Sequence, residues 1–359
     1  MLKKIIIFLV LVIAVFFLGS GHYLNISASL VNKESEEIDR DGFGNSLLVD
    51  GKNIPQTSYI LDNGELIFAQ KNAKEWRKEI VAKNAFAGHE TSISNARDNT
   101  VSILYINKKN QLNLTTKNNE KWKIEKIFGN AALSCSLIFD NKKNPHISFW
   151  SPRDGLSYAN KKNGKWYVRT LDYGEVGWWN DIALDKKQIP HISYFDFRNG
   201  GLLYLTLKNG TWNKENVDFG KDVGRWNSIV VDKDDNIFIS YIDSNTGSLK
   251  MAKKTKGGWL IEKIDDSQTI GEDTNISLDN AGNPVIAYSG LSDNTFRIAK
   301  KIAGSWSIFL VESSTSLSRK NIKGDIGGNS SLFIDSQGKA YLLWQDLSKE
   351  KLKYIEKKF

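Results

Sequence analysis

The sequence has very few of the residues that build covalent cross-links or metal centres. It contains one cysteine, Cys135, and four histidines among 359 residues. A single cysteine excludes an intramolecular disulfide and a cysteine-based zinc site. No phosphate-binding loop, Gly-x-Ser-x-Gly elbow or His-Glu-x-x-His motif is present. We therefore expect neither a metal nor another cofactor, and no common motif of a hydrolase or nucleotide-binding enzyme stands out.

Arginine is also scarce, since it supplies only 9 of the 49 basic residues, although the formal net charge is +8. The lysines are spread through polar segments such as Asp140–Asn144 and Lys161–Gly164. Nucleic-acid-binding proteins usually concentrate basic residues on one element, so we expect no nucleic-acid partner. The lysines are interpreted as a solubilising coat, with an acidic polymer or an anionic cell surface as the alternative partner.

Long apolar runs are absent except at the N-terminus. Met1–Lys4 is basic, Ile5–Leu18 is a run of 14 apolar residues, and the small residues Gly19–Gly21 follow. This order is typical of an export signal, and the run is shorter than the roughly 20 residues of a spanning helix. We therefore predict a signal peptide or N-terminal anchor over residues 1–21 and an exported protein, whether secreted, periplasmic or held at the cell surface.

The rest of the chain is one repeat. Tryptophans recur at spacings of 46, 44, 46, 47 and 47 residues, and an aromatic residue stands 17 or 18 residues before each of them. An aspartate stands nine residues before most of those aromatics. The repeating tryptophans are Trp76, Trp122, Trp166, Trp212, Trp259 and Trp306. A seventh copy begins at Asp335, and the chain ends before its tryptophan.

Each repeat reads as four short strands, which is typical of a β-propeller blade. Asp181–Asp185 is an alternating run that ends in Asp, and the next strand begins at Pro190 after a polar turn. The Asp side chain is expected to bond back to the turn backbone. Seven repeats predict an all-β, seven-bladed propeller with four antiparallel strands per blade, in which the recurring Tyr and Trp pack between blades.

The last repeat lacks its outer strand, and residues 22–31 have no other assignment. An open ring would leave two unpaired strand edges. We therefore predict that residues 22–31 supply the missing strand and close the ring, so that residues 22–359 form one domain.

Antiparallel connectivity sorts the connections into two faces. The turns after the first strand and the hairpins after the third strand share one face, which we call the turn face. The remaining connections lie on the opposite, loop face, where variable loops on a rigid scaffold commonly carry function. We expect the mouth of the central channel to lie there, with carboxylates, arginines and tryptophans that suit a polar ligand with flat apolar faces. The candidate ligand-binding residues are Trp178, Trp179, Asp181, Arg225, Trp226, Arg153, Arg198, Asp196 and Asp243.

Two resemblances follow from the repeat. The hairpins Lys162–Trp166, Lys208–Trp212 and Ala303–Trp306 resemble the end of the sialidase Asp-box, Ser-x-Asp-x-Gly-x-Thr-Trp, with Gly-x-Trp in common. The segment Pro190–Tyr194 is similar to repeats of exported bacterial propellers. These resemblances imply the fold. They do not imply sialidase catalysis, because the chain has seven repeats and no Arg-Ile-Pro.

Three functions remain open. We expect a non-catalytic monomer that binds a glycan or another cell-surface ligand. A polysaccharide-active enzyme, such as a sialidase-like glycosidase or a lyase, is the first alternative. For that enzyme, Glu90, Asp181 and Asp273 are the candidate catalytic carboxylates and His89 is the candidate base. A scaffold that docks protein partners is the second alternative.

Overall fold

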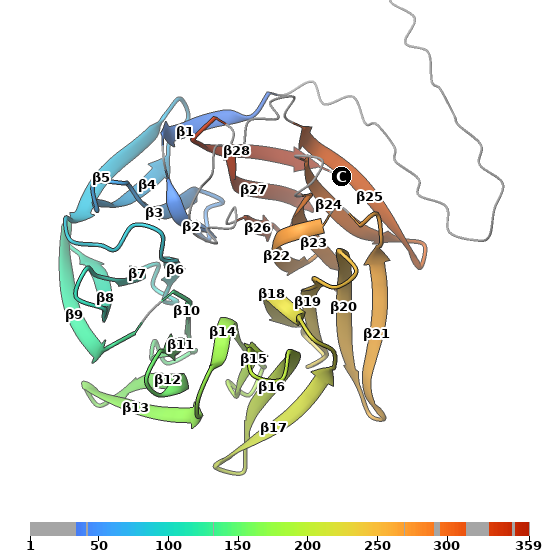
Figure 1. Cartoon of the computed structure of the whole chain (residues 1–359). Helices are drawn as coiled ribbons and strands as arrows, with labels where there is room; N and C mark the ends of the chain where they lie inside the picture. The colour runs from blue at the N-terminus through green and yellow to red at the C-terminus, as the bar shows by residue number, and fades with distance from the viewer. Residues whose placement is uncertain are drawn as a thin grey trace, which may run out of the picture.

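The computed structural model describes residues 34–40, 42–131, 133–268, 270–290, 295–313, 330–346 and 349–358. The regular elements in these ranges are 28 β-strands, grouped into seven four-stranded antiparallel sheets around a central axis (Figure 1). The predicted seven-bladed propeller is therefore confirmed. Within the described ranges no helix has the length and apolarity needed to cross a membrane. The predicted signal or anchor at residues 1–21 lies outside these ranges.

Each blade runs from an inner to an outer strand. The first three blades consist of β2 (Phe43–Val49), β3 (Pro55–Ile60), β4 (Leu66–Lys71) and β5 (Trp76–Ala82); β6 (Ser92–Asn95), β7 (Val101–Ile106), β8 (Gln111–Asn118) and β9 (Lys121–Gly129); and β10 (Cys135–Phe139), β11 (Pro145–Ser151), β12 (Gly155–Lys162) and β13 (Lys165–Asp172).

The fourth, fifth and sixth blades repeat this order. They consist of β14 (Val176–Leu184), β15 (Pro190–Asp196), β16 (Gly201–Lys208) and β17 (Thr211–Asp218); β18 (Val223–Val231), β19 (Ile237–Asp243), β20 (Ser248–Thr255) and β21 (Gly258–Asp265); and β22 (Ile270–Leu278), β23 (Pro284–Gly290), β24 (Thr295–Ile302) and β25 (Ser305–Ser313).

The seventh blade joins the two ends of the described chain. It consists of β26 (Ser331–Ile334), β27 (Lys339–Asp346), β28 (Lys351–Lys358) and β1 (Glu36–Arg40). The blue β1 lies beside the red β28 in Figure 1, with Glu36 opposite Tyr354. An N-terminal strand thus completes this blade, but the predicted boundaries were wrong, because β1 fills the place assigned to residues 22–31. Those residues lie outside the described ranges.

Neighbouring blades are held together by a recurring contact, which we call the interblade clasp. A Lys on the third strand and the Trp on the fourth strand of one blade both bond to a Glu on the fourth strand of the preceding blade. Lys117 Nζ lies 2.8 Å from Glu79, and Trp122 Nε1 donates to the same carboxylate at 3.2 Å. The set recurs as Lys161–Glu125–Trp166, Lys254–Glu215–Trp259 and Lys301–Glu262–Trp306.

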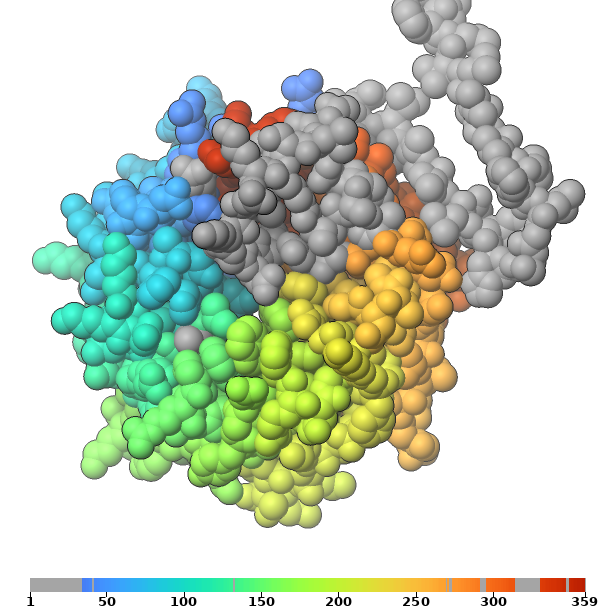
Figure 2. All heavy atoms as spheres, viewed as in Figure 1, coloured from blue at the N-terminus to red at the C-terminus, as the bar shows by residue number. Residues whose placement is uncertain are grey.

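The recurring tyrosines also reach the preceding blade, where they donate to an Asp at the end of the outer strand. Tyr194 bonds Asp172 at 2.9 Å, and Tyr241 bonds Asp218 at 2.6 Å. The predicted interblade role of the Tyr and Trp repeat is therefore confirmed. The Asp that opens each turn accepts backbone N–H groups as expected, since Asp185 Oδ1 bonds the N–H of Lys187 and of Ile189. The space-filling view shows neighbouring blades packed side by side around the face (Figure 2).

Ring closure by β1 generates a stability prediction. Ile38 is buried in the cluster that joins the last blade to the first, so Ile38→Ala should lower the free energy of unfolding by about 2–4 kcal/mol. Arg40, which is exposed on the same strand, is the control. Arg40→Ala should change the free energy of unfolding by less than about 0.5 kcal/mol. Chemical denaturation measures both values. Equal small effects would contradict closure by β1.

Candidate functional site

The loop face carries two matching strained loops at the inner ends of neighbouring blades. β14 begins Val-Gly-Trp-Trp-Asn and β18 begins Val-Gly-Arg-Trp-Asn. Trp179 and Trp226 both have a φ of 47°, which is unusual for a residue with a bulky side chain. Asn180 and Asn227 stabilise these bulges by donating to the carbonyls of Gly177 and Gly224 at 2.8 and 3.0 Å. Such strain is concentrated at functional sites.

The glycine in each loop is required by the fold. Gly224 has a φ of 110°, and a Cβ there would lie 2.7 Å from the Cα of Leu202 in the preceding blade. Gly177 meets Leu156 in the same way at 2.8 Å. Each loop therefore packs its glycine against the neighbouring blade and turns the following side chains toward the mouth of the channel.

These side chains gather in one aromatic cluster around a cation. Arg225 Cζ lies 5.4–5.9 Å from the ring centroids of Trp179, Phe195, Phe197 and Trp226. Trp178 packs on Trp150 at 4.6 Å and on Phe197 at 5.2 Å between centroids. The aromatic cluster is defined here as Trp150, Trp178, Trp179, Phe195, Phe197, Arg225 and Trp226. Phe197 is 45% exposed, so the cluster reaches the surface.

The polar atoms of the cluster are only partly paired. Arg225 Nη2 donates to Asp222 at 2.7 Å. The Nε of Arg225 and the Nε1 of Trp178 are buried and have no hydrogen-bond partner among the described residues. Buried donors without a protein partner are uncommon in native proteins and mark places where a ligand or ordered water completes the network.

The other predicted ligand-binding residues do not belong to the cluster. Asp196 is buried and accepts the N–H of Arg198 at 2.9 Å and the amide of Asn199 at 2.9 Å, so it caps its own turn. Asp243 is also buried. Burial alone would raise the pKa of its carboxyl, but bonds from Lys250 and Asn245 outweigh this effect and lower the pKa. These contacts favour a structural role for both aspartates, and their predicted ligand binding stays a prediction.

The three predicted arginines are not brought together at the channel. Arg198 pairs with Asp172 and Asp196, and Arg153 is exposed on another blade. None of Arg153, Arg198 and Arg225 is among the residues that line the channel cavity. These arginines therefore do not meet at the channel cavity, and ligand binding by Arg153 and Arg198 stays a prediction.

A polar cavity of about 140 Å³ occupies the inner end of the channel, lined by residues from all seven blades. Trp179 and Trp226 line it, so the aromatic cluster adjoins it. Below them a belt of hydrogen bonds passes from blade to blade through the inner strands. In this belt the side chains of Ser46, Ser92, Asp181, Ser228 and Asn275 accept the N–H groups of Ile93, Leu137, Ile229, Ile276 and Leu332, respectively.

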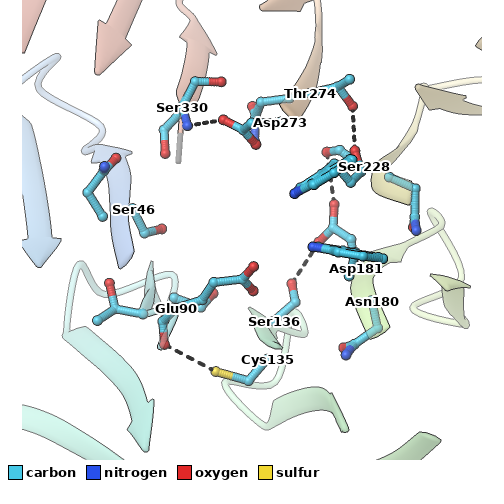
Figure 3. A pocket seen from close by; sticks show the side chains of 18 residues that line it. Ser46, Glu90, Cys135, Ser136, Asn180, Asp181, Ser228, Asp273, Thr274 and Ser330 are labelled. Carbon is cyan, nitrogen blue, oxygen red and sulfur yellow. Dashed lines mark hydrogen bonds between the residues drawn. The ribbon is translucent and has the colours of Figure 1, made fainter. Parts of the chain in front are cut away.

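Asp181 is a member of this belt. Its Oδ1 accepts Ser136 at 2.7 Å and its Oδ2 accepts Ser228 at 3.0 Å (Figure 3). Oδ1 also accepts the N–H of Ile182, and Oδ2 accepts the N–H of Ile229 at 3.0 Å. Burial raises the pKa of Asp181, and these four bonds oppose that shift. Because both oxygens are occupied by neighbouring blades, this aspartate joins blades, and we do not retain it as a catalytic or ligand-binding residue.

Glu90 and Asp273 also line the cavity and lie on its opposite sides in Figure 3. Burial, followed by the nearby charge of Asp273, raises the pKa of Glu90 to about 8. The carboxyl of Glu90 is therefore mostly protonated at neutral pH. Asp273 has a φ of 67° and accepts the N–H of Ser330.

His89 does not join them. It is buried, its Nδ1 accepts the N–H of Leu133 at 2.8 Å, and its ring packs on Phe86. Burial lowers the pKa of His89 to about 4, so the ring is neutral. It is absent from the cavity lining, so nothing in this geometry supports the predicted role as a lyase base. Among the described residues no group of three or more His, Cys, Asp or Glu is arranged to hold a metal ion.

Sequence reasoning missed three members of the aromatic cluster, Trp150, Phe195 and Phe197, and also Asp222, which bonds Arg225. Phe197 stands between two residues that were selected, and Asp222 precedes the Val-Gly-x-Trp-Asn segment of β18. Trp150 lies at the end of β11, one residue after the recurring aromatic. Only the matching Val-Gly-x-Trp-Asn segments of two successive repeats signalled this location in the sequence.

Comparisons with known proteins place the fold. No protein-family model and no curated protein matches the chain. The BP39L lectin from Burkholderia pseudomallei is similar in structure, with a TM-score of 0.68, 13% identity, and coverage of 88% of this chain and 96% of the lectin. A mutant of Aleuria aurantia lectin in complex with alpha-methyl-L-fucoside has a TM-score of 0.52 at 13% identity, covering 78% of this chain and 99% of the lectin.

An ulvan lyase, described as a new family of polysaccharide lyase, has a TM-score of 0.60 at 10% identity and covers 90% of this chain and 96% of the lyase. At these identities the likeness shows the fold alone. The resemblance to Asp-box repeats and to exported bacterial propellers stays a prediction.

The raised pKa of Glu90 predicts a pH dependence of stability. The unfolded carboxyl loses its proton near pH 4.5 and the folded one near pH 8, so the folded state binds more protons between these values. The contribution of Glu90 to stability is therefore present at low pH and is lost as the pH rises toward 8.

Glu90→Gln should flatten this part of the pH profile, measured as the free energy of unfolding by denaturant between pH 5 and 8. Glu120→Gln, which changes an exposed hairpin carboxyl, is the control and should keep the wild-type slope. An unchanged slope in Glu90→Gln would contradict the assignment.

Proposed function

We propose that this chain is an exported, non-catalytic propeller that binds a glycan at the aromatic cluster on its loop face. The observation that carries the proposal is the position of Arg225, which lies among four aromatic rings with its Nε unpartnered. The cluster is held by strained loops of two successive blades.

The chemistry of this arrangement suits a sugar. A pyranose ring has C–H groups on its flat faces and hydroxyl groups around its edge. Exposed aromatic rings accept the flat face, whereas a guanidinium donates to hydroxyl or carboxylate oxygens. The partly exposed ring of Phe197 and the adjacent guanidinium of Arg225 supply both kinds of contact side by side. A rigid, mostly apolar site with few polar groups is the usual form of a small-molecule site.

The structural neighbours support the same class of ligand. Two of them are lectins, one in complex with alpha-methyl-L-fucoside, and a third is an ulvan lyase. These names describe those proteins, and they guide the choice of ligands for testing this one.

The channel cavity favours binding over cleavage. Its volume of about 140 Å³ is below the roughly 300–1,000 Å³ of small-molecule sites. Two-carboxylate glycoside hydrolysis needs one ionised partner beside the acid. Here Asp181 has both oxygens bonded to neighbouring blades, which ties this carboxylate to the scaffold. A polysaccharide-active enzyme remains the second candidate because the pKa of Glu90, at about 8, suits a proton donor near neutral pH.

The glycan site predicts the effect of two substitutions. Phe197→Ala and Arg225→Gln should each weaken retention on immobilised fucosylated glycans or ulvan by at least about tenfold, since each removes one half of the sugar contact. Affinity electrophoresis of the folded variants measures this retention. Tyr167→Ala is the matched control, because Tyr167 is 55% exposed on β13 outside the cluster.

Equal retention by all three variants would contradict the site. New product masses in the same incubations, lost in Glu90→Gln, would favour the enzyme. Neither retention nor cleavage of any glycan would contradict the proposed ligand class and favour the protein-docking scaffold.

A further inference from the structure

The turn face of the third and fourth blades is a lysine surface. In the turns and hairpins of these two blades, and in the residues beside the hairpins, seven lysines are exposed and no acidic residue is exposed. Two of the seven, Lys143 and Lys186, pair with Asp98 and Asp235 of neighbouring blades. The other five, which we call the lysine patch, are Lys142, Lys162, Lys165, Lys187 and Lys208.

The acidic residues of these turns are directed inward. Asp140 Oδ1 accepts the N–H groups of Lys142 and Asn144 at 2.8 and 2.7 Å, and Asp185 accepts those of its own turn in the same way. These aspartates shape the turns and are not exposed. The exposed side chains that carry charge at the tips are therefore all basic.

The connections on this face are also short and alike. The turns 140–144 and 185–189 each have five residues and the same Asp cap, and the hairpins 163–164 and 209–210 each have two residues between their strands. Short connections of equal length leave no protruding loop, so the lysine patch is a broad, even surface. Such a surface fits an extended planar partner better than a small ligand.

The path of the chain adds an independent observation. In the seventh blade β28 ends on the turn face, and β1 runs antiparallel to it, with Glu36 opposite Tyr354 and Arg40 opposite Lys351. β1 therefore starts on the turn face. The residues before Glu34, which include the basic and apolar sequence of residues 1–18, join the propeller on the same side as the lysine patch.

We propose that the turn face docks on an anionic lipid surface through the lysine patch, with the loop face directed away from the lipid. Lysines near an anionic bilayer are attracted by its surface potential, and the attraction decays within a Debye length. The aromatic cluster, on the opposite face, then stays accessible. This proposal does not depend on glycan binding.

The test is partition of the purified full chain between buffer and vesicles at low salt. One set of vesicles is phosphatidylcholine, and the other contains phosphatidylglycerol as well. Any apolar insertion by the N-terminal sequence is common to both sets, so the ratio of the two partition coefficients reports the electrostatic part. We expect a ratio well above one that falls toward one with added salt.

A fourfold variant, Lys142→Gln, Lys162→Gln, Lys187→Gln and Lys208→Gln, should lower this ratio by at least about tenfold. The control variant removes the same number of positive charges from the loop face and should retain most of the wild-type partition ratio. Its four substitutions, all at exposed lysines, are Lys83→Gln, Lys108→Gln, Lys109→Gln and Lys221→Gln. A wild-type ratio near one, or equal losses in both variants, would overturn the proposal. Equal affinity of the wild type for a soluble polyanion such as heparin would also overturn it.

Discussion

The interblade clasp is the contact on which the rest of the structure depends. A single four-stranded blade exposes two apolar faces and cannot form a stable core alone. In the clasp, a Lys and a Trp of one blade bond a Glu of the preceding blade, as in Lys301 and Trp306 with Glu262. Four blade interfaces carry this complete contact, and the ring is completed where β1 pairs with β28 in the seventh blade.

A rigid ring of this kind separates structural from functional polar groups. The hydrogen-bond belt uses Asp181 to join three blades, so a buried carboxylate in the channel is satisfied without any ligand. The bulged loops at the starts of β14 and β18 have a further role besides the hydrogen-bond belt. They hold Trp179 and Trp226 in a backbone conformation that bulky residues rarely adopt, and they place Arg225 among aromatic rings. The scaffold therefore supports the strain at the mouth of the channel.

Most of the fold could be predicted from the sequence, because the Trp, Tyr and Asp repeat reflects contacts that recur in most blades. The closing strand could not be placed, since Glu36–Arg40 is short and has no repeat marker. The site was predicted only in part. Trp178, Trp179, Arg225 and Trp226 were predicted because they lie in connections of the loop face that precede inner strands, whereas Phe197 reaches the cluster from a different loop. The sequence could not show which donors the fold brings to Asp181, Asp196 and Asp243, and those donors favour structural roles for these carboxylates.

The central claim is that a glycan contacts the aromatic cluster, and the most direct measurement is NMR of the tryptophan indole N–H groups during titration with a fucosylated glycan or an ulvan fragment. The account predicts saturable shifts of Trp178, Trp179 and Trp226 and unchanged signals from the clasp residues Trp122, Trp166 and Trp306. Binding that leaves the three cluster signals in place, or that moves the clasp signals instead, would contradict it.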